Sequence, residues 1–312
     1  MRMEIRASQP NRILNSQECQ LYPGYAGDNL VFIVGAPRSG TTWLQRLLAC
    51  HPAVRTGQES KLFRWYIAPQ LRMWRMETSR EVDPKTATGR GGTGLSCYFR
   101  EDEFLSLLRQ YLFSLLTPMV GPLQPGEIFV EKSPSHALCI SEINFLLPES
   151  RIIHLLRDPR EVVASLLAAS RSWGSAWAPR DAGKAAELWR EHVQTVRAAA
   201  KTLSDETFLE IRYEELLNAP QENLQRVMHF LNLEWSEEEI RQAIRKNSAN
   251  SPAISLIPLY GEVAKREGAF VKEPQGFVRR ALAGAWKSDL ALFDRLKIWR
   301  VCHELMRELS YL

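Results

Sequence analysis

A continuous apolar run followed by a glycine-bounded loop constrains the fold of this chain more than any other feature. Residues 30–34 read Leu-Val-Phe-Ile-Val, which is the pattern of a strand buried on both faces of a parallel sheet. Residues 35–42 read Gly-Ala-Pro-Arg-Ser-Gly-Thr-Thr, and apolar residues at helical spacing follow until Pro52. The sequence therefore predicts a strand, a loop of phosphate-binding size and a helix.

The rest of the chain repeats this alternation of strands and helices. Further strands are predicted at 128–130, 152–156 and 208–211. Helices are predicted at 161–169, 183–202 and 220–232, with a C-terminal helix whose apolar stripe holds Leu292, Leu296, Trp299 and Met306. Strands that alternate with helices favour an α/β fold, a central parallel sheet flanked by helices.

Residues 30–312 are predicted to form a single domain, preceded by an N-terminal arm over residues 1–29. Two segments, 60–126 and 171–180, combine aromatic residues with glycines in long connections, and we expect them to cover a binding site. The alternative is that their aromatic residues belong to the core and their glycines mark plain turns.

Composition excludes several classes of protein. Forty basic and 36 acidic residues give a net charge of +4, too small for a nucleic-acid coat but suited to an anionic ligand if the basic residues cluster. No apolar run is long enough for a transmembrane helix, and residues 1–30 contain no apolar stretch typical of a signal peptide. We therefore expect a soluble, cytoplasmic protein.

Cysteine usage points the same way. The five cysteines are an odd number and widely spaced, which predicts buried free thiols in a reducing compartment. No tight group of Cys and His indicates a metal site, and no metal is expected.

The glycine-bounded loop is typical of an anion site but not of an ATPase. Gly35 and Gly40 permit a tight turn whose backbone N–H groups can surround a phosphate at the helix N-terminus. Thr41 stands where a P-loop NTPase carries its phosphate-binding Lys, and a cation is instead present inside the loop, at Arg38. A nucleotide kinase or P-loop NTPase stays open only as an alternative.

Residues 37–44, Pro-Arg-Ser-Gly-Thr-Thr-Trp-Leu, resemble the 5′-phosphosulfate loop of the sulfotransferases that use 3′-phosphoadenosine 5′-phosphosulfate (PAPS). Three further segments match that family in order, so the resemblance runs from about residue 30 to about residue 290. The cofactor-binding residues it implies in the loop are Pro37, Arg38, Ser39, Gly40, Thr41, Thr42 and Trp43.

Residues 155–165 resemble the family's 3′-phosphate motif, which assigns Arg157 and Ser165 to that phosphate. Asp158 can cap the helix that Pro159 opens. Residues 277–287 are similar to the family's C-terminal loop, in which Arg279 and Arg280 would close over the same phosphate.

One residue of that C-terminal loop departs from the family pattern. Ala281 stands where the pattern has Gly, which puts the local backbone shape in doubt. Residues 211–220 resemble the segment whose Tyr lies near the adenine. That resemblance assigns Tyr213 to this contact, and Trp43 is the candidate for stacking on the ring.

The same resemblance implies the catalytic residues. Arg38 would stabilise the leaving phosphate, and Lys132 would contact the transferring sulfuryl group. Residues 51–59 resemble the tyrosyl-protein branch, in which Glu59 would be the general base. His136 is the runner-up, because small-molecule sulfotransferases carry a His two residues after their Lys and here the separation is four.

We therefore expect a PAPS-dependent sulfotransferase that releases adenosine 3′,5′-bisphosphate (PAP). The acceptor would be a hydroxyl of a carbohydrate, a small alcohol or phenol, or a peptide tyrosine. Eukaryotic members of that family that act on secreted glycans and peptides usually carry a membrane anchor; because none is visible in this sequence, we expect a soluble, bacterial enzyme. A catalytically silent PAP- or PAPS-binding module is a further alternative, although both Arg38 and Lys132 are present.

Overall fold

A computed structural model describes residues 27–79, 94–248, 256–258, 270–272 and 284–312. At its centre lies a five-stranded sheet in the order β2-β3-β1-β4-β5. The strands are β1 (Leu30–Val34), β2 (Val54–Thr56), β3 (Ile128–Lys132), β4 (Arg151–Leu156) and β5 (Phe208–Arg212), and all four neighbouring pairs are parallel. The predicted parallel α/β sheet is confirmed.

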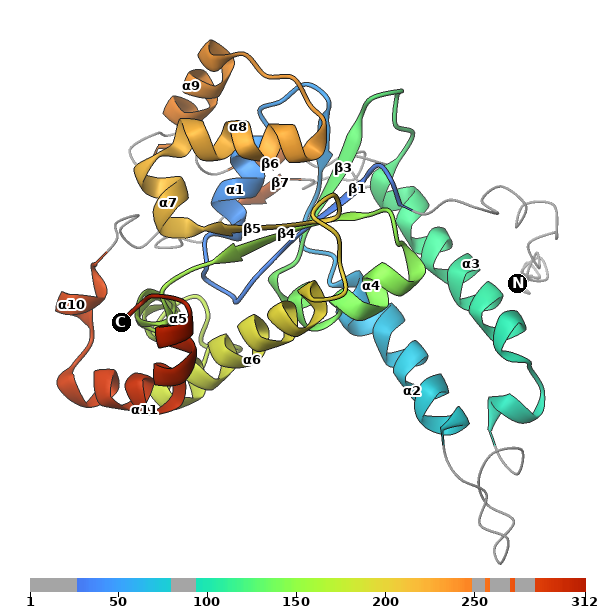
Figure 1. Cartoon of the computed structure of the whole chain (residues 1–312), viewed down its shortest axis with the longest axis horizontal. Helices are drawn as coiled ribbons and strands as arrows, with labels where there is room; N and C mark the ends of the chain where they lie inside the picture. The colour runs from blue at the N-terminus through green and yellow to red at the C-terminus, as the bar shows by residue number, and fades with distance from the viewer. Residues whose placement is uncertain (1–26, 80–93, 249–255, 259–269, 273–283) are drawn as a thin grey trace, which may run out of the picture.

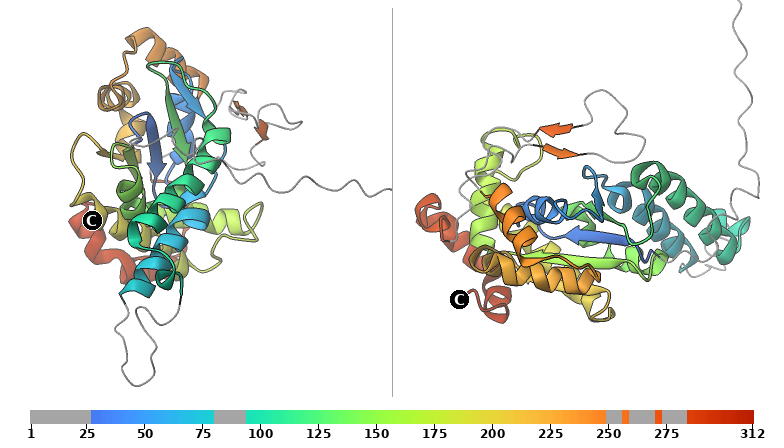
Figure 2. Two further views of the ribbon diagram at one scale, coloured as in Figure 1. Left: turned by 90° about the vertical axis from the view of Figure 1, so that its right-hand side faces the viewer. Right: turned by 90° about the horizontal axis from the view of Figure 1, so that it is seen from above.

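Helices cover both faces of this sheet (Figure 1). On one face lie α1 (Thr41–Leu48), α8 (Pro220–Leu231) and α9 (Glu237–Lys246), with the short α7 (Tyr213–Asn218) leading into α8. The opposite face carries α2 (Ala68–Thr78), α3 (Glu101–Val120), α4 (Ile140–Leu146) and α6 (Ala182–Ala200), and α5 (Pro159–Ser170), α10 (Trp286–Asp289) and α11 (Leu292–Glu308) extend that layer. A two-stranded antiparallel pair, β6 (Leu256–Pro258) and β7 (Phe270–Lys272), is set apart from the sheet (Figure 2).

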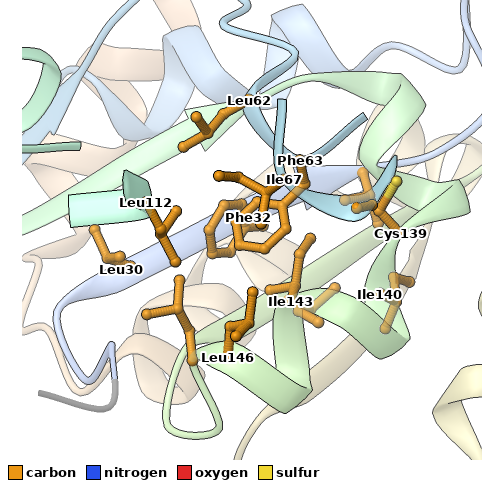
Figure 3. Close-up of a cluster of buried hydrophobic side chains, with 14 of the residues drawn as sticks. Leu30, Phe32, Leu62, Phe63, Ile67, Leu112, Cys139, Ile140, Ile143 and Leu146 are labelled. Carbon is orange, nitrogen blue, oxygen red and sulfur yellow. The ribbon is translucent and has the colours of Figure 1, made fainter. Parts of the chain in front are cut away.

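The residues of β1 alternate between two cores because successive side chains of a strand point to opposite faces. Leu30, Phe32 and Val34 belong to the cluster that contains α2, α3 and α4 (Figure 3). Val31 and Ile33 belong to the cluster on the α1, α8 and α9 side. Both faces of β1 are thus buried, which is why its sequence is apolar without interruption.

Residues 60–126, predicted to be a long connection that covers a binding site, contain helices that pack on the core. A π-helical turn (Phe63–Ile67) leads into α2, and α3 follows. Trp74 is buried and stacks on Phe104 at 4.1 Å, whereas Trp65 and Met73 are exposed. Part of this segment is therefore core, as the alternative interpretation proposed, and its glycine-rich stretch lies outside the described residues apart from Gly94.

The apolar stripe predicted for the C-terminal helix is offset from the face that α11 buries. Leu292, Leu296 and Trp299 are exposed. Of the predicted stripe only Met306 is buried, and it packs against α5 and α6 together with Ile298, Cys302 and Leu305. Both faces of α11 hold apolar residues at helical spacing, so spacing alone could not decide which face packs.

The cysteine prediction is half right. Cys139 and Cys302 are buried, and burial raises the pKa of these thiols to about 11 and about 12. Cys50 and Cys97 are exposed, and all four are free. The fifth, Cys19, lies outside the described residues. Within the described ranges, no helix combines the length and the hydropathy needed to span a membrane.

We predict that α3 contributes to the stability of the domain and is not a detachable cover. Leu112→Ala removes a fully buried side chain from the cluster around Phe32 and should lower the free energy of unfolding by about 2–5 kcal/mol. Leu107→Ala, on the exposed side of the same helix, should change it by less than about 0.5 kcal/mol. Urea denaturation measures both, and equal losses would contradict the packing described here.

Candidate functional site

The predicted site residues meet because all five strands end at the same edge of the sheet. The loop 35–40 follows β1, Glu59 follows β2 by three residues, and Lys132 is the last residue of β3. Arg157 follows β4 directly, and Tyr213 follows β5. The chain runs from β1 to β2 and β3 on one side and then crosses to β4 and β5 on the other, and ligands of open α/β sheets bind at such a reversal.

Two glycines of the loop are required by close contacts. A Cβ on Gly35 would lie 2.6 Å from the carbonyl oxygen of Leu155, and one on Gly40 would lie 2.5 Å from the ring of Tyr213. Gly40 also has a φ of +97°, and Arg38 has one of +76°. This backbone turns back tightly between β1 and α1, and it holds the loop against the ends of β4 and β5.

The N-terminus of α1 has the properties of an anion site. Gly40 precedes the helix without a side-chain cap, and the first turn contains no acidic residue. The hydroxyl of Ser39 is buried and has no hydrogen-bond partner among the described residues. An uncapped helix N-terminus beside an unsatisfied buried donor suits a phosphate or sulfate oxygen.

Arg38, Arg157 and Ser165 lie together beside this loop. Arg38 Nε donates to Ser165 Oγ (3.0 Å), and Arg157 Nη1 donates to the carbonyl oxygen of Arg38 (3.1 Å). Arg157 Nη2 lies 3.5 Å from Glu161 Oε2, while its buried Nε has no partner within the described part of the chain. Asp158 caps α5 as predicted, accepting the N–H of Arg160.

Tyr213 adjoins Arg157, and Trp43 adjoins Tyr213. The Arg157 guanidinium lies 4.0 Å from the centre of the Tyr213 ring, and Tyr213 meets Trp43 edge-on at 5.7 Å. Trp43 Nε1 donates to the carbonyl oxygen of Asn247 (3.2 Å). Burial raises the pKa of the Tyr213 hydroxyl. The structure thus brings both predicted adenine contacts to one place.

Glu59 and Lys132 form an ion pair next to the loop. Lys132 Nζ lies 2.5 Å from Glu59 Oε1. The Lys132 side chain is buried, whereas that of Glu59 is 39% exposed. Gln45 of α1 supports the segment before Glu59, because its Nε2 donates to Thr56 Oγ1 (2.7 Å) and to the carbonyl oxygen of Gly57 (2.8 Å).

His136 lies in the core and not beside this ion pair. It is fully buried between the rings of Phe32 and Phe63. Its Nε2 accepts the backbone N–H of Phe63 (3.1 Å), and its Nδ1 lies 2.9 Å from Glu131 Oε2. Both ring nitrogens are therefore engaged.

Residues that sequence reasoning missed complete the site. Buried Glu131 and Ser133 and half-buried Ser60 form a hydrogen-bond network beside the Glu59–Lys132 pair. They adjoin the predicted residues in sequence, but only the fold shows that they are bonded to one another. Trp173, from the predicted cover 171–180, lies 5.1 Å from the guanidinium of Arg38. Part of that cover therefore does reach the site.

The C-terminal motif is only partly described. Arg279, Arg280 and Ala281 lie outside the described residues. The end of the motif is described: the backbone N–H of Trp286 donates to Glu161 Oε1 (3.1 Å), which places it against α5. His, Cys, Asp and Glu side chains of the described ranges form no group that could hold a metal ion.

The close contact between Gly40 and Tyr213 gives a stability prediction. Gly126→Ala should lower the free energy of unfolding by about 1–2 kcal/mol, because Gly126 has a positive φ but open space around it. Gly40→Ala adds the collision with the Tyr213 ring and should cost about 1–3 kcal/mol more. Chemical denaturation of the two variants compares them directly, and equal costs would contradict the contact.

The structure is similar to solved sulfotransferases. The sulfotransferase domain from the Synechococcus PCC 7002 olefin synthase matches with a TM-score of 0.52 and 19% identity, covering 89% of this chain and 96% of that one. A mouse sulfotransferase solved in complex with PAP matches with a TM-score of 0.54 and 16% identity, covering 90% of this chain and 85% of that one. These likenesses confirm the predicted sulfotransferase fold.

Curated relatives are protein-tyrosine sulfotransferases of animals. Protein-tyrosine sulfotransferase 1 of Danio rerio is 27% identical over 229 residues, which cover 73% of this chain and 60% of the relative. Protein-tyrosine sulfotransferase 2 of Gallus gallus is 24% identical over 209 residues, 67% of this chain and 52% of the relative. The chain thus spans little more than half the length of these two relatives.

These relatives overturn the predicted localisation. A cytoplasmic, bacterial protein was expected, and the matching relatives are instead animal protein-tyrosine sulfotransferases. The expectation failed because hydropathy reports which segments can span a membrane and not in which compartment a protein works. The family prediction, in contrast, is confirmed: the sulfotransferase family model matches residues 30–237, more than half of the sequence, and the chain belongs to the sulfotransferase family.

Proposed function

We propose that this chain transfers a sulfuryl group from PAPS to an acceptor hydroxyl. The observation that carries the proposal is the juxtaposition of two buried, unsatisfied donors with the Glu59–Lys132 ion pair. Ser39 Oγ and Arg157 Nε lack partners within the described residues. Anionic oxygens would satisfy both, and PAPS carries such oxygens at both ends of its ribose.

Three groups of residues fit the three parts of PAPS. Ser39 and the N-terminus of α1 would hold the 5′-phosphosulfate. Arg157 and Ser165 would hold the 3′-phosphate, since a guanidinium suits the oxygens of a phosphate. Trp43 and Tyr213 would contact the adenine. The contacts of Tyr213 with both Arg157 and Trp43 support this division, because the base and the 3′-phosphate are borne by the same ribose.

In the proposed reaction, a bond forms between the acceptor oxygen and sulfur while the bond from sulfur to the 5′-phosphate oxygen breaks. The leaving phosphate gains negative charge, which Arg38 and the positive end of α1 would stabilise. Lys132 would neutralise charge on the transferring group. The hydroxyl proton passes to Glu59.

Glu59 is favoured over His136 as the general base. The Glu59 side chain is partly exposed beside Lys132 and can meet an incoming hydroxyl. His136 is fully buried and both of its ring nitrogens are engaged. A base must reach the proton that it removes, and His136 would have to leave the core to do so.

A peptide tyrosine is the acceptor that we propose to test first. The support is the set of animal relatives named protein-tyrosine sulfotransferases. A phenol and an alcohol need the same base and the same cations, so carbohydrates and small alcohols are the other outcomes of an acceptor screen.

PAP binding tests the donor site. Isothermal titration should show that PAP binds more tightly than ADP or adenosine 5′-phosphate. Arg157→Ala should weaken the affinity for PAP by about 30-fold or more, as expected for a lost buried charge contact. Arg151→Ala, at the amino end of the same strand, should leave affinity unchanged. Binding of ADP without preference for a 3′-phosphate would instead favour the P-loop NTPase.

Turnover tests the base. Glu59→Gln should lower kcat by about 10²- to 10⁴-fold with PAP affinity retained, measured with labelled PAPS and a tyrosine peptide. Glu127→Gln, at the amino end of β3 where Glu127 pairs with Arg55, serves as the matched control and should keep full activity. A loss below about tenfold in Glu59→Gln would remove Glu59 from this role.

A further inference from the structure

The carboxylate of Glu131 is the centre of a buried hydrogen-bond network. Ser60 donates to Oε1 through its backbone N–H (3.1 Å) and its hydroxyl (2.6 Å), and the Ser133 hydroxyl donates to the same oxygen (2.7 Å). His136 Nδ1 lies 2.9 Å from Oε2. Burial alone would raise the pKa of Glu131, but His136 and the hydroxyls of Ser60 and Ser133 outweigh it and hold the pKa below its usual value. The carboxylate is therefore charged, and its Oε1 accepts three hydrogen bonds.

The tautomer of His136 follows from its partners. Nε2 accepts the N–H of Phe63 (3.1 Å), so it carries no proton. The ring proton is then on Nδ1 and faces Glu131 Oε2. The imidazole sits fully buried against Phe32 and Phe63, which fixes its orientation. His136 thus links Glu131 to the backbone at Phe63.

These contacts fasten one short segment to the end of β3. Ser60 is held by Glu131, the N–H of Lys61 donates to Ser133 Oγ (3.0 Å), and the N–H of Phe63 donates to His136. Residues 60–63 follow Glu59 directly. We call Glu131, His136, Ser60 and Ser133 the Glu131 clamp.

Residues of the Glu131 clamp are sequence neighbours of both members of the Glu59–Lys132 ion pair. Lys132 lies between Glu131 and Ser133 in sequence, and Glu59 immediately precedes Ser60. Because neighbouring residues of a strand point to opposite faces, Glu131 can anchor the segment from one face while Lys132 meets Glu59 from the other. The two halves of the ion pair thus come from elements that the clamp joins.

We propose that Glu131, acting with His136, is a positioning residue that sets the distance between Glu59 and Lys132. The inference rests on the proposed function for its catalytic consequence, but the positioning itself is a property of the fold. Glu131→Gln removes the charge and puts an NH2 donor in place of one carboxylate oxygen, so either the hydroxyls of Ser60 and Ser133 or the N–H of His136 lose their acceptor. The segment that carries Glu59 would then loosen, and a displacement of about 1 Å can cost about 100-fold in rate.

Glu131→Gln tests the proposal through two readouts. Hydrogen–deuterium exchange over residues 57–63 should accelerate by about tenfold or more. With labelled PAPS and a tyrosine peptide, kcat should fall by about 100-fold while the KM for PAPS stays within about twofold. Glu142→Gln breaks the ion pair between buried Glu142 of α4 and exposed Arg72 of α2, and it should change neither readout.

A double-mutant cycle separates positioning from general destabilisation. If Glu131 acts through Glu59, adding Glu131→Gln to Glu59→Gln should slow the enzyme by less than about threefold further. Losses that multiply in the double variant would overturn the proposal. So would exchange over 57–63 that matches the wild-type protein.

Two further outcomes remain decisive. If Glu131→Gln does not fold, Ser60→Ala removes one bond of the Glu131 clamp and is measured in the same way. If the wild-type protein transfers sulfate to no acceptor, the proposed function fails, and exchange over residues 57–63 alone then decides whether the clamp holds this segment.

Discussion

The contact of the loop after β1 with the ends of β4 and β5 is the constraint on which the rest of the site depends. Gly35 lies against the backbone of Leu155, and Gly40 lies against the ring of Tyr213. Neither position has room for a Cβ, so the loop is fixed where three parallel strands end. That placement puts the N-terminus of α1 next to Arg157 and gives one anion site two sources of positive potential.

The site concentrates buried cations that the fold alone does not need. Arg157 and Lys132 are buried. Glu161 lies 3.5 Å from Arg157, and the Glu59 side chain that pairs with Lys132 is partly exposed, so neither cation is fully compensated within the site. Burying charge costs several kcal/mol per ion unless a partner repays it. An anionic ligand is the partner that would repay it here, and the unsatisfied Ser39 hydroxyl has the same requirement. These buried groups lower the stability of the ligand-free fold, and they preorganise the edge of the sheet to bind an anion.

Local patterns predicted the parts of the molecule that local physics determines. The apolar run at 30–34 and the glycine spacing after it led correctly to β1 and α1, because burial on both faces and a tight turn leave direct marks in sequence. The edge strand at 54–56 was missed because three residues with Arg55 in the middle form no apolar run. Glu131 was missed for another reason: two of its partners, Ser60 and His136, are brought to it only by the tertiary structure.

A crystal structure of the chain with PAP would test the central claim most directly. Our account predicts the 5′-phosphate at Ser39 and the N-terminus of α1, the 3′-phosphate on Arg157 and Ser165, and the adenine beside Trp43 and Tyr213. Glu59 and Lys132 would then flank the open side of the 5′-phosphate. A nucleotide bound elsewhere, or with the two phosphates exchanged, would contradict the assignment of this edge as the sulfuryl-donor site.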